Sequence, residues 1–179
     1  MEFSADSTDR PDEIIALFEA TFGESEGAEE GRLVGKLAKD LLETTAEDDL
    51  LVFTAREDDA LAGVIIFSRL VYPQDARTVF LLSPVAVESS RQGQGLGQAL
   101  LKHGLAGLRA RGVDVAITYG NPDYYGKVGF RPIGEDTAQP PQPLRQPEGW
   151  LAQSLTGRPL DPLKGPARCV SAFDDPDYW

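Results

Sequence analysis

Apolar residues in the first part of the chain recur at helical spacing and predict two helices. The first begins at Pro11, where a first-turn proline is favoured, and its apolar pattern is predicted to stop at Gly23. The second covers residues 33–42 and follows Glu29 and Glu30, whose charge suits the start of a helix. The connection between the helices is predicted to be a glycine-rich acidic loop that holds Glu24, Glu26, Glu29 and Glu30.

The middle of the chain has the composition of β-strands joined by short turns. Residues 50–56, residues 61–72 and the run that ends at Val87 predict three successive antiparallel strands. A helix over residues 94–111 and a strand over residues 113–118 then complete a βαβ crossover, so the two strands of the crossover are parallel. The pattern therefore predicts an α/β protein with a mixed sheet.

The two ends of the chain are less regular. Residues 1–4 form either a short edge strand or a frayed end. Residues 132–147 hold five of the thirteen prolines and predict an extended loop. Residues 149–155 are predicted to form a helical turn and residues 167–173 a last strand. We expect a single domain over residues 1–179, in which residues 1–133 form the core and residues 134–179 a proline-rich extension.

A glycine loop lies between the strand that ends at Val87 and the helix that follows. Gly93, Gly95 and Gly97 allow positive φ and leave the backbone open to a ligand. The free amides and the dipole at the start of the helix favour an anion, most simply a phosphate. An ATPase-type loop would need a lysine directly after the last glycine, and a dinucleotide fingerprint would need glycine where Gln98 stands. A nucleotide-binding α/β protein is therefore disfavoured.

The loop and a second motif together point to a known family. Gln92 to Gly97 read Q-x-x-G-x-G after the strand end Val85-Ala86-Val87, and residues 121–130 read NPDYYGKVGF. In this order and spacing they resemble the GNAT superfamily of N-acetyltransferases, and are most similar to its YhbS-like branch. The resemblance implies the GNAT fold, with a mixed central sheet, splayed parallel strands and flanking helices.

The resemblance implies acetyl-coenzyme A (acetyl-CoA) as acyl donor and a small-molecule or peptide primary amine as acceptor. Tyr125 aligns with the general acid of the family, which protonates the departing thiolate; Tyr124 is the rival. Glu24, Glu29 and Glu30 either form a solvated surface or attract a cationic amine. No general base is assigned. The expected coenzyme-binding residues are Val85, Ala86, Val87, Gln92, Gly93, Gln94, Gly95, Leu96, Gly97, Gln98, Asn121 and Tyr125.

Three details leave alternatives open. Pro84 marks either a simple bulge or the point beyond which the two parallel strands stop pairing, so that pantetheine can satisfy their amides. Asn121 either contacts pantetheine or caps a short helix that begins at Pro122. A non-catalytic acyl-CoA sensor would share the coenzyme site without needing Tyr125 for its function.

Composition narrows the class of protein. The 179 residues suffice for one core, and the net charge of −12 disfavours a nucleic-acid partner. Cys169 and His103 are each single, which predicts no disulfide and no metal site, and we expect His103 to be structural or on the surface rather than catalytic. No apolar run has the length of a membrane span, and the acidic start does not resemble a signal peptide. We therefore expect a cytoplasmic protein without a membrane partner; a homodimer stays open.

Overall fold

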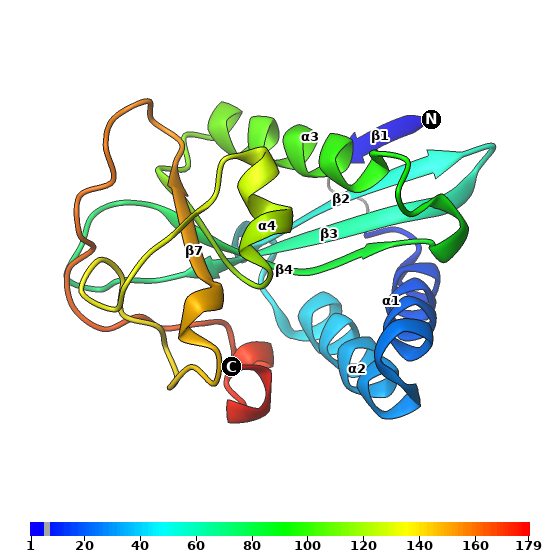
Figure 1. Ribbon diagram of the computed structural model, residues 1–179, viewed down its shortest axis with the longest axis horizontal. Helices are drawn as coiled ribbons and strands as arrows, with labels where there is room; N and C mark the ends of the chain where they lie inside the picture. The colour runs from blue at the N-terminus through cyan, green and yellow to red at the C-terminus, as the bar shows by residue number, and fades with distance from the viewer. Residues whose placement is uncertain (6–7) are drawn as a thin grey trace. The chain divides into compact units, whose positions relative to one another are not determined.

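The computed structural model describes residues 1–5 and 8–179 (Figure 1). Hydrogen bonding orders its strands β1-β2-β3-β4-β5-β7-β6 in one mixed sheet, which confirms the predicted fold class. The chain divides into two compact units, namely 1–67 with 84–104 and 68–83 with 105–179. The strands are β1 (Glu2–Ala5), β2 (Leu50–Glu57), β3 (Ala60–Leu70), β4 (Val79–Val87), β5 (Val115–Tyr119), β6 (Arg131–Pro132) and β7 (Trp150–Ser154). The helices are α1 (Pro11–Glu26), α2 (Ala28–Thr44), α3 (Leu96–Ala110) and α4 (Pro122–Tyr125).

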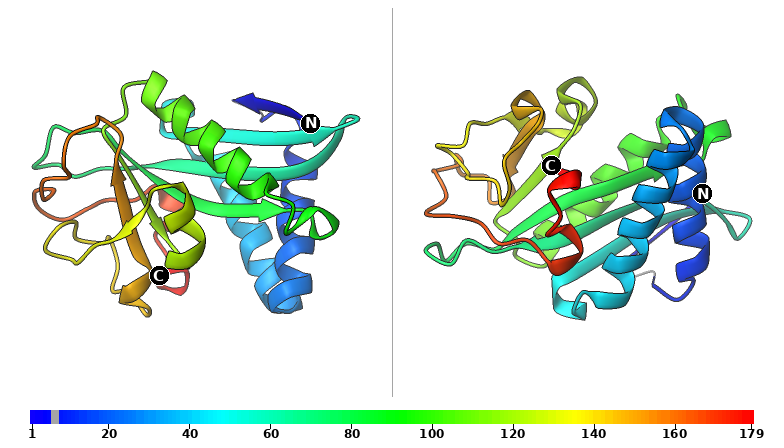
Figure 2. Two further views of the ribbon diagram at one scale, coloured as in Figure 1. Left: turned by 45° about the horizontal axis from the view of Figure 1, so that its top comes forward. Right: turned by 90° about the horizontal axis from the view of Figure 1, so that it is seen from below.

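In the first unit, α1 and α2 lie side by side over one face of β2 and β3 (Figures 1 and 2). The predicted end of the first helix at Gly23 is wrong, because α1 continues to Glu26 and Gly27 alone joins it to α2. The predicted acidic loop is therefore wrong as well. Gly27 has φ 104°, a conformation that glycine adopts without strain, so this single residue can form the turn between α1 and α2.

The other face of the first unit carries the start of α3. A Cβ on Gly104 would lie 2.6 Å from the Ile65 side chain and 2.9 Å from the Phe67 ring, so this glycine allows α3 to approach β3 closely. The ring of His103 stacks on Phe3 at 5.4 Å and meets the edge of Phe53 at 5.7 Å. These ring contacts agree with the structural alternative for His103.

Strand β1 forms one edge of the sheet, next to the β2–β3 hairpin. Of the two alternatives for residues 1–4, the edge strand is observed, since β1 pairs antiparallel with Phe53–Arg56 of β2. The β2–β3 hairpin turns through Asp58 and Asp59, both with positive φ, which a two-residue hairpin requires and Asp tolerates. The Arg10 guanidinium bonds the Asp59 carboxylate at 3.0 Å and so ties the segment before α1 to this turn.

In the second unit, β4 and β5 run parallel, as the crossover pattern predicted. Their register joins Val79–Leu82 to Val115–Thr118, and Leu82 and Thr118 are the last pair. Strand β4 nevertheless continues to Val87. The ladder with β5 therefore ends two residues before Pro84, which agrees with the interpretation that pairing stops near this proline.

The proline-rich extension supplies a strand that the sequence did not reveal. The predicted helical turn over residues 149–155 is wrong, because Trp150–Ser154 form β7 and pair antiparallel with β5. Three successive residues of β7 are buried, so it lacks the alternation that marks a strand. The Trp150 indole N–H donates to the Ala138 carbonyl at 2.8 Å, which fixes the loop before it.

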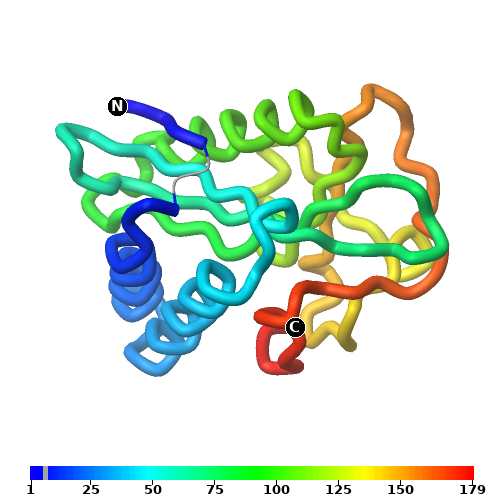
Figure 3. Tube along the Cα trace, turned by 180° about the vertical axis from the view of Figure 1, so that it is seen from behind, coloured from blue at the N-terminus to red at the C-terminus, as the bar shows by residue number. Residues whose placement is uncertain are grey.

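The last residues also differ from expectation. The predicted strand over residues 167–173 is wrong: Arg168 forms an isolated bridge with Val71, and Ser171–Phe173 form a 3-10 turn. Figure 3 shows this segment, in orange to red, running beside the loop after β3. The tail packs inward, since the indole of Trp179 is stacked on Tyr119 at 6.3 Å and donates to the Phe173 carbonyl.

Candidate functional site

The glycine loop of the first unit presents an open backbone at the start of α3. Gly93 and Gly95 have φ of 73° and 81°, and a Cβ at either position would meet nothing within 4 Å. The loop residues 92–95 are exposed, and the helix begins at Leu96. Free amides at a helix start, with no side chain in front of them, are the arrangement that a phosphate needs.

Two glutamine side chains stabilise the loop by bonding its own backbone. The Gln92 side-chain amide donates to the Val87 carbonyl at 3.0 Å, across the turn that leads out of β4. The Gln94 side-chain amide donates to the Ser90 carbonyl at 2.9 Å. Their N–H groups are therefore used inside the loop, and an anion in front of it would meet mainly backbone amides.

Carboxylates hold the 3-10 turn Ser89–Arg91 that precedes the loop. The Ser89 hydroxyl donates to Glu24 at the end of α1, and the Arg91 guanidinium pairs with Glu57 at the end of β2. Arg91, the cation next to the loop in the sequence, is thus engaged with a carboxylate. The attraction for an anion here comes from the amides and the helix dipole.

The end of β4 lies against β3 within the same unit. The Glu88 amide donates to the Ala62 carbonyl at 2.9 Å. Ala86 and Val87 are buried, while Val85 is partly exposed. A Cβ on Gly63 would lie 3.5 Å from the Ala86 carbonyl oxygen, so the two strands are close at this point.

The tyrosine motif lies in the second unit, around α4. The Asn121 side chain caps this helix by accepting from the Asp123 amide at 2.8 Å, so the capping alternative is observed. The ring of Tyr125 packs edge-to-face with the rings of Tyr124 and Phe130, at centroid distances of 5.1 Å and 5.9 Å. These contacts fix the plane of the Tyr125 ring.

Two residues that the sequence did not single out also influence Tyr125. A Cβ on Gly120 would lie 2.6 Å from the Tyr125 ring, so only glycine leaves room for it. The fully buried Thr118 hydroxyl donates to the Leu82 carbonyl at 2.8 Å, and it lowers the pKa of the Tyr125 phenol. In the sequence, the only feature that distinguishes Thr118 is that it places a hydroxyl in the apolar strand predicted over residues 113–118.

The environment of Tyr125 keeps it protonated. Burial raises the pKa of its phenol well above the usual value, and the neighbouring Tyr124 raises that pKa further, while the Thr118 hydroxyl lowers it. The phenol therefore carries its proton at neutral pH, which a general acid requires.

The predicted residues fall into two groups. Val85–Val87 and Gln92–Gln98 lie in the first unit, together with Glu24, Glu29 and Glu30. Glu24 is on the last turn of α1, and Glu29 and Glu30 are on the first turn of α2. Asn121 and Tyr125 lie in the second unit.

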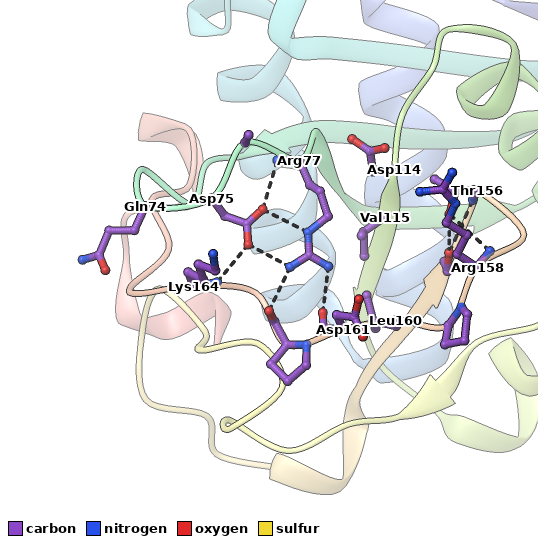
Figure 4. A pocket seen from close by; sticks show the side chains of 14 residues that line it. Gln74, Asp75, Arg77, Asp114, Val115, Thr156, Arg158, Leu160, Asp161 and Lys164 are labelled. Atoms are coloured by element: carbon purple, nitrogen blue, oxygen red, sulfur yellow. Dashed lines mark hydrogen bonds and ion pairs between the residues drawn. The ribbon is translucent and has the colours of Figure 1, made fainter.

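A separate polar pocket of about 840 Å³ lies in the second unit (Figure 4). The residues that line it include an ion pair in which Arg77 bonds Asp75 at 2.7 Å, and Arg77 also donates to the carbonyls of Asp161 and Pro162. None of the predicted site residues lines it.

Among the described residues, His, Cys, Asp and Glu side chains form no group of three suited to a metal ion. No described helix is long and apolar enough to cross a membrane.

Comparison with known proteins decides the family. The domain described as Acetyltransferase (GNAT) domain matches residues 5–133. The chain belongs to the GNAT family. Among curated GNAT relatives, it is 33% identical to the uncharacterized N-acetyltransferase YjhQ of Escherichia coli, over 79% of this chain and 78% of YjhQ. It is also 33% identical to the uncharacterized N-acetyltransferase YhbS of E. coli, over 65% of each chain.

Solved structures agree with the family. The fold resembles E. coli YhbS in complex with CoA, with a TM-score of 0.81 and 22% identity, over 97% of this chain and 92% of YhbS. It also resembles a GNAT family acetyltransferase from Brucella melitensis in complex with acetyl-CoA, with a TM-score of 0.74 and 25% identity, over 97% of both chains. Together with the sequence similarity to YjhQ and YhbS, this likeness supports the YhbS-like branch.

Proposed function

We propose that this GNAT protein transfers the acetyl group of acetyl-CoA to a primary amine by direct attack in a ternary complex. The observation that carries the proposal is the glycine loop, in which Gly93 and Gly95 leave the amides before α3 open. The coenzyme bound by the YhbS and B. melitensis neighbours supports it. The pyrophosphate of the coenzyme would lie on these amides.

The thioester would be held at the end of β4. Because the Glu88 amide faces β3, the alternation of a strand turns the amides of Val85 and Val87 away from β3. There they can bond pantetheine or the thioester carbonyl, whose oxygen gains negative charge during attack. A donor fixed in the backbone stabilises this charge without reorganising.

Tyr125 is the proposed general acid. Its phenol carries a proton at neutral pH and is fixed by its ring contacts, so it can protonate the departing thiolate. The exposed end of α1 and start of α2, with Glu24, Glu29 and Glu30, is the proposed surface that attracts a cationic acceptor.

The test is incubation with acetyl-CoA and a panel of primary amines, with release of free thiol as the measurement. Tyr125→Phe is expected to lower kcat by about 10²- to 10⁴-fold and to leave coenzyme binding intact. Tyr124→Phe is the matched control and should retain most activity. Coenzyme binding without turnover on any amine would favour the acyl-CoA sensor, and absence of coenzyme binding would contradict both functions.

A further inference from the structure

Three aromatic rings pack together where the ladder between β5 and β7 ends. Tyr119 of β5 and Trp150 of β7 face each other as the last pair of this ladder. The ring of Trp179 stacks on Tyr119 at 6.3 Å with an interplanar angle of 16°, and it packs against Trp150 at 6.1 Å with an angle of 66°. Its indole N–H donates to the Phe173 carbonyl at 2.9 Å, and the residue is almost fully buried. Trp179 is therefore held in one orientation against the end of the ladder.

The backbone directly beyond this pair is bonded through the same residues. The Gln146 amide donates to the Tyr119 hydroxyl at 2.7 Å, and the Gln146 carbonyl accepts from the Gly149 amide at 2.9 Å. The Gly149 carbonyl in turn accepts from the Gly120 amide at 2.9 Å. A Cβ on Gly149 would lie 2.9 Å from the Gly120 carbonyl oxygen, so the two backbones are in direct contact. The position of Gly120 thus depends on how Tyr119 and the turn after Gln146 are held.

Gly120 links this aromatic cluster to the proposed general acid. A Cβ on Gly120 would lie 2.6 Å from a carbon of the Tyr125 ring, so the backbone at Gly120 bounds this ring directly. Elsewhere the ring packs against Tyr124 and Phe130. A misplacement of about 1 Å in a reacting group can cost about 100-fold in rate. A displacement of Gly120 would therefore lower turnover by moving the acid.

We propose that Trp179 is a positioning residue for Tyr125. It holds Tyr119 and Trp150 in place at the end of the ladder, and the bonds beyond that pair carry the restraint to Gly120. The inference rests on the proposed function, and Trp179 itself takes no part in proton transfer. Loss of its ring would remove one side of the packing around Tyr119 and Trp150. The end of the ladder would then open locally, because few buried contacts would be left to hold it.

A plainer role would be that Trp179 only stabilises the second unit. Both roles predict that Trp179→Ala lowers the thermal unfolding midpoint, since a large buried side chain is lost. They differ in whether turnover falls because Tyr125 moves. Trp179→Phe keeps an aromatic ring at the position. Leu163→Ala is the matched control for stability, because Leu163 is also buried in the extension and its amide bonds the Thr137 carbonyl, away from the end of the ladder.

The first experiment measures kcat and KM on the full chain, below the unfolding midpoint of every variant. Trp179→Ala should lower kcat by about 10- to 100-fold with little change in KM for acetyl-CoA, and Trp179→Phe should retain most of kcat. Leu163→Ala should leave kcat unchanged. In the Tyr125→Phe background, Trp179→Ala should cause no further loss. An unchanged kcat in Trp179→Ala, losses that multiply in the double variant, or an equal loss in Leu163→Ala would overturn the inference.

The second experiment needs no turnover. Magnetisation transfer in NMR spectra between the Hα protons of Gly120 and the ring protons of Tyr125 reports their contact directly. It should weaken in Trp179→Ala and stay unchanged in Leu163→Ala. Should Trp179→Ala fail to fold, Trp179→Leu keeps more of the apolar volume and should show the same loss at a smaller size.

The two experiments separate the inference from the proposed function. A contact between Gly120 and Tyr125 that is as strong in the Trp179 variants as in the wild type would overturn the inference alone. A wild type that binds coenzyme but acetylates no amine would overturn the proposed function and with it the catalytic role of Trp179.

Discussion

At Gly95 and at Gly120 the absence of a side chain is required for two different reasons. Gly95 lies in open space with φ 81°, so its backbone conformation is what demands glycine. Gly120 has no positive φ, but the Tyr125 ring occupies the place of its Cβ. Substitution by alanine therefore disturbs the loop in one case and the aromatic ring in the other.

Gly95→Ala is expected to weaken coenzyme binding. An L-residue in this conformation costs about 1–2 kcal/mol, and relief of the strain would move the amides away from the phosphate. Gly157→Ala is the matched control, because Gly157 has φ 76°, meets nothing within 4 Å and lies far along the chain from the loop. Both variants should lose similar stability in urea, and only Gly95→Ala should bind coenzyme less tightly by calorimetry. Equal coenzyme affinity in the two variants would contradict the assignment of the loop.

Gly120→Ala is expected to displace the Tyr125 ring. The new Cβ would lie 2.6 Å from a ring carbon, and we expect kcat to fall by about 10- to 100-fold with coenzyme affinity retained, because a shift of about 1 Å misplaces the acid. Gly126→Ala is the control, since its Cβ would lie 3.7 Å from the nearest atom, the Arg131 guanidinium. Full activity of Gly120→Ala in thiol-release assays would show that the position of this ring is unimportant.

The sequence was informative about this site where the chemistry is local. The glycines of residues 93–97 follow a strand directly and precede a helix, so their role could be read from adjacent residues. Gly120 and Thr118 could not be found in this way, because the contact of Gly120 with the Tyr125 ring and the hydrogen bond of Thr118 to Leu82 join residues that only the folded chain brings together.

At the scale of elements, the pair α1 and α2 shows that helix packing determines whether a glycine ends a helix or lies inside it. Gly23 was expected to end α1, but it lies inside the helix, where Gly31 of α2 approaches it. A Cβ on Gly31 would lie 2.8 Å from the Gly23 Cα and 2.6 Å from the Glu19 carbonyl oxygen. A glycine that permits close helix contact and a glycine that ends a helix look the same in a sequence.

Gly31→Ala and Gly23→Ala should change stability in opposite directions. The first forces backbone atoms apart and should cost about 1–3 kcal/mol. The second adds a Cβ whose nearest neighbour is 4.0 Å away, so the better helix propensity of alanine should add up to about 1 kcal/mol. Urea unfolding followed by circular dichroism measures both. A destabilised Gly23→Ala would mean that the two helices leave less than 4.0 Å for a Cβ at Gly23.

The misassigned elements of the extension have a common cause. β7 is defined by its pairing with β5, which lies about thirty residues earlier in the chain, and its buried run Trp150–Ala152 has no period of its own. The first meander and the crossover were predicted correctly because their strands carry strong apolar runs and short turns. Pairing over a long separation leaves no such local mark.

At the scale of the whole molecule, one ion pair ties the extension to the loop before β4. The Asp75 carboxylate accepts from Arg77 at 2.7 Å and from the Lys164 amide at 3.1 Å, and Arg77 reaches the Asp161 carbonyl (Figure 4). These bonds hold the pKa of Asp75 well below its usual range. The anchor joins residues nearly ninety positions apart.

Asp75→Asn should lower stability at neutral pH by about 1–3 kcal/mol, the cost of losing charged hydrogen bonds. Because the folded pKa of Asp75 is depressed, its contribution is complete above the unfolded value near 4 and is lost as the pH falls toward the folded pKa. The difference between wild type and variant should therefore shrink between about pH 5 and pH 2 in thermal unfolding. A difference that stays constant over this range would contradict the role of the charge.

The placement of the aromatic residues gives the chain two optical reporters. Its two tryptophans, Trp150 and Trp179, are 1% and 3% exposed and both belong to the second unit. The two longest helices, α1 and α2, belong to the first. Fluorescence thus reports mainly on one unit and far-ultraviolet dichroism mainly on the other. If the two units unfold in one cooperative transition, the fluorescence and dichroism curves will superimpose. If one unit unfolds first, the midpoints of the two curves will differ, and the curve with the lower midpoint will identify the less stable unit.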